Sequence, residues 1–185
     1  VNDTQKNGDY VLHICSLTNG AIGDNLSVDC MIDVHRRNNI KVNHTATHLL
    51  HQSLKDVLGS HVNQAGSLVH PEYLRFDITH PNKISSKELE AIELIVNQKI
   101  GEDITVETSI KSLEEAKKEG ATALFGEKYG DQVRVVTMGD FSKELCGGTH
   151  VSSTGKINKF KIKHDKAISS GIRRINAITH NQVDL

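Results

Sequence analysis

The stretch from residue 43 to residue 59 decides the fold, and it reads NHTATHLLHQSLKDVLG. Its apolar residues recur at helical spacing and are Ala46, Leu49, Leu50, Leu54, Val57 and Leu58. Gly59 is a typical helix-ending residue, so the stretch predicts a helix that stops there. His44 and His48 lie four residues apart, which places both imidazoles on one face. We expect this face to point away from the core, with His51 near it in a supporting or surface position.

Several segments around this helix show the alternation or apolar content of strands, and two others have helix-start signals. Ser85-x-x-Glu88 and Ser112-x-x-Glu115 are capping boxes, which predict helices ending at Gly101 and near Gly120. The predicted strands span 10–14, 26–32, 67–79 with an interruption at Pro71, 103–109, 133–138, 160–163 and 171–178. Strands mixed with a few helices indicate an α+β domain, preceded by a small β piece.

The composition is that of a globular protein. The 185 residues are 37% hydrophobic and 24% charged, which excludes an intrinsically disordered chain. The apolar runs are too short to cross a membrane, and the polar start carries no signal-peptide core, so we expect no membrane association. The chain does not begin with Met, and we expect it to be cut from a longer protein. Three cysteines cannot all pair, which favours a reducing compartment, with Cys15 and Cys30 as inert core thiols.

Charge is unevenly distributed, although the net charge is only -1. Residues 85–131 hold 11 acids and 6 bases, whereas residues 151–174 hold 7 bases and one acid, Asp165. The second segment is either a phosphate-binding surface or a solvated strand edge protected by lysines, and the charge count leaves both alternatives open.

A second cluster of chemically active residues spans 144–150 and reads ELCGGTH. Cys146 and His150 are again four apart, but the two intervening glycines indicate a tight turn that lets thiolate and imidazole converge. Together with His44 and His48 they form a soft nitrogen and sulfur ligand set that favours zinc. The alternative, four unrelated polar residues, would be preferred for either pair alone.

Five segments resemble the editing domain of alanyl-tRNA synthetases: residues 43–52, 62–67, 123–131, 139–150 and 171–175. The similarity runs from about Val11 to Thr179, and the paired HxxxH and CxxxH motifs are specific together. The editing domain of threonyl-tRNA synthetases shares this architecture, but it typically has Pro before the final histidine. Thr149 occupies that position here, which favours the alanyl branch.

This resemblance implies a two-layer α+β editing domain at 41–185, preceded at 1–40 by part of a small β-barrel. It implies hydrolysis of tRNA(Ala) mischarged with serine or glycine, because a synthetase pocket separates such close neighbours from alanine by only about 1–3 kcal/mol. We expect a cytoplasmic protein that neither binds ATP nor charges tRNA within this chain.

Residue by residue, the resemblance assigns the metal ligands and the role of Gln64, and the basic segment at 151–174 supplies the predicted tRNA contacts. His44, His48, Cys146 and His150 would hold the zinc ion (Zn²⁺). Gln64 would contact the amino acid or a water and, with Cys146, would make up the catalytic site. The predicted tRNA contacts are Lys159, Lys161, Arg173 and Arg174.

Two alternatives stay open at this point: a free-standing trans-editing protein of the same superfamily, and a non-catalytic, zinc-stabilised tRNA-binding module. A structural zinc site would be closed and buried, whereas an editing site should open into a groove lined by Gln64 and the basic strands. Gln64 could also be an ordinary polar residue at a strand edge.

Overall fold

The computed structural model describes residues 1–8, 10–123 and 129–179, and the chain divides into two compact units, 1–32 and 33–185. The division comes earlier than expected from the sequence. A boundary after residue 40 would fall inside helix α1 (Val34–Leu58), which begins directly after the second unit starts.

The first unit contains one antiparallel hairpin, β1 (Asp3–Asn7) and β2 (Tyr10–Ile14), followed by irregular chain. The strand predicted at 26–32 is wrong, because these residues adopt no regular structure. Alternation alone does not form a strand without a neighbour to pair with, and Leu26 and Val28 are exposed. Cys15 and Cys30 are exposed as well, so the prediction of core thiols is also wrong.

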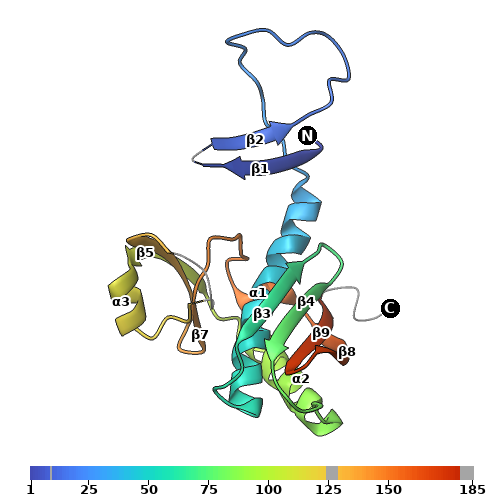
Figure 1. Ribbon diagram of the computed structural model, residues 1–185, viewed down its shortest axis with the longest axis vertical. Helices are drawn as coiled ribbons and strands as arrows, with labels where there is room; N and C mark the ends of the chain where they lie inside the picture. Colours follow the sequence, from blue (N-terminus) through green and yellow to red (C-terminus); the bar gives the residue numbers. More distant parts are fainter. Residues whose placement is uncertain (9, 124–128, 180–185) are drawn as a thin grey trace. The chain divides into compact units, whose positions relative to one another are not determined.

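The described residues of the second unit form two antiparallel sheets and three α-helices, which confirms the predicted α+β class (Figure 1). The larger sheet has the order β3 (Gln64–Val69), β4 (Leu74–Thr79), β9 (Ile172–Thr179), β8 (Phe160–Ser169). The smaller sheet consists of β5 (Val106–Ser112), β6 (Gln132–Met138) and β7 (Ser142–Leu145). A 3-10 turn, η1 (Thr154–Ile157), precedes β8.

The predicted helix signals are confirmed. Ser85 and Ser112 form reciprocal capping boxes at the starts of α2 (Ser86–Gly101) and α3 (Leu113–Lys118). Asp33 caps α1 through a 2.9 Å hydrogen bond from the Arg36 backbone amide. Gly59 ends α1 with a φ of 115°, a left-handed conformation that costs glycine little.

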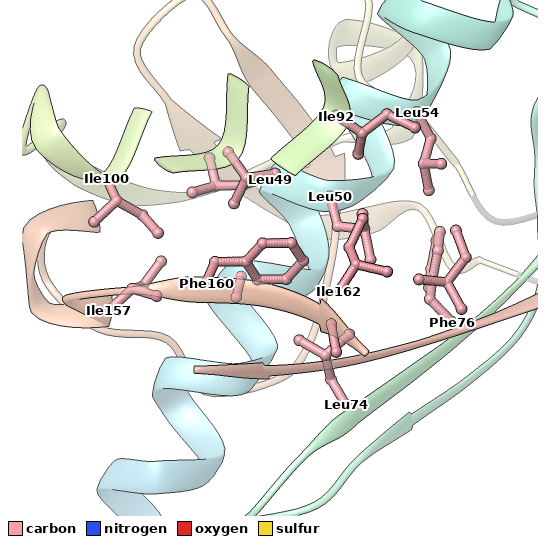
Figure 2. Packing of buried hydrophobic residues seen from close by; sticks show 14 of the residues in the cluster. Leu49, Leu50, Leu54, Leu74, Phe76, Ile92, Ile100, Ile157, Phe160 and Ile162 are labelled. Carbon is pink, nitrogen blue, oxygen red and sulfur yellow. The ribbon is translucent and has the colours of Figure 1, made fainter. Parts of the chain in front are cut away.

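The main core lies between α1, α2 and the larger sheet (Figure 2). Leu49 and Leu50 of α1 meet Ile92 of α2, with Phe76 and Phe160 from the sheet, and all five are essentially buried. Burying each such side chain contributes about 1.5–3 kcal/mol to folding. The apolar stripe of α1 is therefore the surface that fixes the helix against the sheet.

The face of α1 that carries His48 and His51 is covered as well, because Glu144 of β7 contacts both histidines and the His51 ring packs against Phe76 of β4. His48 and His51 are accordingly buried, at 4% and 2% exposed. The expectation that this face points away from the core is wrong. A helix pattern shows which face is apolar, but not that a second sheet covers the polar face. No helix among the described residues is long and apolar enough to cross a membrane.

Candidate functional site

Two segments about a hundred residues apart meet at one point. α1 supplies His44 and His48, and the turn after β7 supplies Cys146 and His150. One ligand atom from each of the four side chains lies within 4.8 Å of every other. Sγ of Cys146 is 3.4 Å from Nε2 of His44 and 3.4 Å from Nε2 of His150. We call these four residues the His/Cys cluster.

The turn that carries Cys146 is held by Arg134 and leaves no room for a side chain at Gly148. The guanidinium of Arg134 donates to the carbonyls of Cys146, at 2.9 Å, and Gly148. A Cβ at Gly148 would lie 2.6 Å from Nδ1 of His44 and closer still to Cε1. Glycine is therefore required there so that the backbone can approach the imidazole.

Hydrogen bonds to Thr45 select the tautomer of His150. The Thr45 hydroxyl donates its single proton to the Lys41 carbonyl at 2.9 Å, so it can only accept from Nδ1 of His150 at 3.1 Å. His150 thus carries its proton on Nδ1 and presents the lone pair of Nε2 toward Cys146. This is the usual way in which a supporting group orients a metal-binding histidine.

A buried carboxylate, Glu144, lies between two imidazoles of α1. Its Oε1 is 3.2 Å from Nδ1 of His51, and its Oε2 is 3.7 Å from Nδ1 of His48. Burial alone would raise the pKa of Glu144, but His48 and His51 together outweigh burial and hold that pKa below its ordinary value. The ionised carboxylate is placed to orient His48, as in carboxylate–histidine–metal arrangements.

The clustered histidines are held neutral. Burial, followed by the charge of His48, lowers the pKa of His44 to about 4. Burial, followed by the neighbouring His48 and His44, lowers the pKa of His150 to about 2. The pKa of His48 is also lowered, mainly by burial. At neutral pH these rings therefore offer lone pairs rather than charges, which is the state that binds a cation.

The His/Cys cluster fits a metal ion. Three neutral imidazoles and one thiol each bring a ligand atom to one point, and this nitrogen and sulfur donor set is of the kind that binds zinc. Among the described residues, the buried Nδ1 of His48 has no hydrogen-bond partner, and the Glu144 carboxylate lies 3.7 Å from it. The structure thus contains a group of residues positioned to bind a metal.

A small cavity of about 160 Å³ opens beside this cluster, and we call it the aminoacyl-sized cavity. Its lining includes His44, His48 and Cys146 of the cluster, together with Gln64 and Ser67 of β3. Gln64 is half-buried at the start of β3, near the metal-binding group but outside it. The structure therefore brings Gln64 and the cluster together, as the sequence predicts for an editing site.

The predicted tRNA contacts lie on β8, on β9 and in the chain just before β8, and ion pairs involve Lys161, Arg173 and Arg174. Lys161 contacts Glu93 at 2.8 Å, Arg174 contacts Asp77 at 2.7 Å, and the buried Arg173 pairs with Asp165. Lys159 is exposed between η1 and β8. Contact of these residues with tRNA stays a prediction, and the acidic partners offset much of the charge that the sequence count suggests.

Three supporting residues were not assigned from the sequence, namely Thr45, Arg134 and Glu144, whereas a supporting position was one of the two expected for His51. Glu144 belongs to the quoted ELCGGTH stretch and alternates with Leu145 on a strand, so a buried acid beside a ligand was a usable signal. Arg134 carried no signal, because its role depends on the pairing of β6 with β7. Of the motif at 123–131, residues 124–128 lie outside the described part of the chain.

Fold and site together define a synthetase-associated domain with a His/Cys metal-binding group. Residues 133–176 match the family model described as the threonyl and alanyl tRNA synthetase second additional domain. This match covers β6, β7 and β8, the turn with Cys146 and His150, and part of β9.

Similarity to particular proteins covers nearly the whole chain. The chain is 53% identical to alanine--tRNA ligase 1 of Lachnoclostridium phytofermentans over 184 residues, which are 99% of this chain and 21% of that protein. It is 56% identical to the alanine--tRNA ligase of Bacillus anthracis over 97% of this chain and 20% of the relative. For the Haemophilus influenzae enzyme the identity is 52% over 100% of this chain and 21% of the relative.

The chain thus spans about a fifth of the length of the curated relatives it matches. It is similar over its length to a segment of alanine--tRNA ligases, and the predicted resemblance to the alanyl-tRNA synthetase editing domain is confirmed.

Proposed function

We propose that this chain is a post-transfer editing domain that hydrolyses the ester of Ser-tRNA(Ala) and Gly-tRNA(Ala). The observation that carries the proposal is the shared cavity: the metal-fitting cluster and the non-ligand amide of Gln64 line the same small space. A purely structural metal site needs no such space beside it.

The metal proposed is zinc, held by His44, His48, Cys146 and His150, because thiolate and imidazole together favour it. When bound, zinc supplies Lewis-acid polarisation and positions groups that approach it. Four protein ligands complete a tetrahedral site, which favours an organising role. Cys146 accordingly counts as catalytic only through its place in the cluster.

The reaction itself is ester hydrolysis. A water oxygen bonds to the ester carbonyl carbon, the bond to the terminal ribose oxygen breaks, and that oxygen takes a proton. Gln64 offers two amide protons and one carbonyl acceptor, which suits holding the water or the serine hydroxyl. Because the side chain projects from the end of β3 beside the cluster, it can do this without ligating the metal.

Cavity size supports selection for small amino acids. About 160 Å³ is below the range of about 300–1,000 Å³ typical of sites for drug-sized ligands, so it suits a seryl or glycyl group. A site built to bond the serine hydroxyl rejects alanine, because its polar groups would be left unpaired. Hydrolysis of the glycyl ester would depend only on how well the glycyl group fits the cavity.

The partner proposed is the acceptor end of tRNA(Ala) in the cytoplasm, with Lys159, Lys161, Arg173 and Arg174 as candidate contacts. The parent enzyme would attach alanine to tRNA(Ala) with ATP outside this chain, and a free-standing trans-editing protein would use the same chemistry.

The test is release of serine from Ser-tRNA(Ala) by the purified chain, with Ala-tRNA(Ala) as the matched control substrate. We expect hydrolysis of the seryl ester, loss of it after chelation, and recovery when zinc is added back. A chain that binds tRNA and zinc but leaves the ester intact would instead be a zinc-stabilised tRNA-binding module.

A further inference from the structure

A second hollow, of about 520 Å³, is lined by His150 and by residues of α1, β5, β6 and η1. Its lining includes three bases from three different elements: Lys41 of α1, Arg134 of β6 and Lys156 of η1. Asn38 of α1 and His150 also face it. None of its described lining residues is acidic, and we call it the basic hollow.

The other large hollows of the described chain differ in charge. One of about 650 Å³ is lined by Glu107, Glu119 and Asp140 against the single base Lys143. A neighbouring one of about 560 Å³ mixes two acids with two bases. A polyanion approaching this domain therefore meets a favourable potential at the basic hollow and not at these two.

Arg134 keeps its positive charge available to this hollow. Its three hydrogen-bond acceptors are two backbone carbonyls and the Thr108 hydroxyl, all of them uncharged. Lys156 has one acid near it, Asp103, whose carboxylate accepts from the Gly155 amide at 2.9 Å. The described lining of the hollow thus holds three bases and no acid, with Asp103 beside Lys156.

The His/Cys cluster connects the basic hollow with the aminoacyl-sized cavity. His150 lines the hollow, His44, His48 and Cys146 line the cavity, and the ligand atoms of all four lie within 4.8 Å of one another. Both spaces thus border the cluster at which the reacting bond would lie. The cavity is too small for a nucleotide, whereas the hollow falls within the range of ligand sites.

We propose that the basic hollow binds the terminal nucleotide of the tRNA acceptor strand, with Lys41 and Lys156 contacting its phosphodiester. The ester then lies at the cluster and the amino acid in the aminoacyl-sized cavity. This assignment rests on the proposed editing function, and it places the principal phosphate contacts at Lys41 and Lys156 rather than along β8 and β9. Arg134 contributes charge while it holds the turn of Cys146.

The test uses the double variant Lys41→Gln/Lys156→Gln of the full chain. The matched control is Lys117→Gln/Lys118→Gln, which removes the same charge from exposed positions on α3. The first readout is binding of an uncharged tRNA(Ala) acceptor hairpin at several salt concentrations. Each lost single-strand phosphate contact should reduce the slope of log K against log salt by about 0.7, and affinity about fivefold near 0.1 M salt.

The second readout compares hydrolysis of a seryl-hairpin with hydrolysis of the serine ester of adenosine, which has no phosphate. We expect the double variant to be slower on the hairpin at subsaturating concentration and unchanged on the adenosine ester. A salt slope equal to that of the control variant, or the same loss of rate on both esters, overturns the inference. If the wild-type chain cleaves neither ester, the proposed function fails, and the binding slope alone decides whether the hollow holds phosphate.

Discussion

Replacing Gly148 by alanine should remove metal binding without unfolding the domain. The new Cβ would lie 2.6 Å from Nδ1 of His44, whereas ordinary contacts between such atoms begin at about 3.5 Å. The imidazole must therefore retreat by roughly 1 Å, or the turn must move by that distance. The ring is not a free chain end, because Nε2 lies 3.4 Å from Cys146 and the ring is also hydrogen-bonded to the backbone of Thr149.

The size of the effect follows from the narrow tolerance of metal bonds. A zinc–nitrogen bond of about 2.0–2.1 Å tolerates errors of about 0.2 Å, so a displacement of roughly 1 Å removes one ligand of four. Disturbing only a supporting residue typically costs 10–100-fold in metal affinity, and we expect about 100-fold or more here. The assay is competition between the chain and a chromophoric chelator, with thermal unfolding of the metal-free chain measured in parallel.

The neighbouring glycine provides the matched control. A Cβ at Gly147 meets nothing within 4 Å, so Gly147→Ala should bind metal like the wild type. Wild-type affinity in Gly148→Ala would refute the reasoning, because it would show that the turn adapts to a side chain at no cost. Equal losses in both variants would also refute it, since backbone entropy rather than the contact with His44 would then be responsible.

Three further outcomes follow from the geometry. Gln64→Ala should leave zinc content and thermal stability unchanged while hydrolysis of Ser-tRNA(Ala) falls about ten- to a thousandfold, because a transition-state contact of about 1.4–4 kcal/mol is lost; wild-type rates would contradict this role. Glu144→Gln should lower zinc affinity 10–100-fold in the same chelator competition, since it removes the charge facing His48; unchanged affinity would exclude Glu144 as a supporting group. Replacing Lys159 and Lys161 should weaken tRNA binding and reduce its dependence on salt concentration. An unchanged salt dependence would indicate that both lysines only form a solvated strand edge.

Local signals in the sequence predicted many of the elements correctly. The capping boxes at Ser85 and Ser112 and the terminating Gly59 act within four residues of themselves, so no distant contact is needed to interpret them. The prediction of a strand at 26–32 was wrong for the opposite reason. A strand needs a partner, and alternation does not show whether one is present.

The residues that fit a metal were predictable because the members of each pair lie only four positions apart in the sequence. Two pairs four residues apart, one on a helix and one across a double-glycine turn, restrict their side chains locally before any folding is considered. The structure confirms that the two pairs share one point, and it supplies the reason for Gly148, which no spacing could give.

The sequence by itself determined the helix and its ligand spacing, the glycine turn, and the choice of nitrogen and sulfur donors, because each is a property of a few adjacent residues. Only the tertiary structure decided what surrounds them. It buried the polar face of α1, placed Glu144 between His48 and His51, and paired Arg173 and Arg174 with acids on other strands. These outcomes depend on which strands lie beside each other, and therefore on contacts between residues far apart in the chain, which no local pattern specifies.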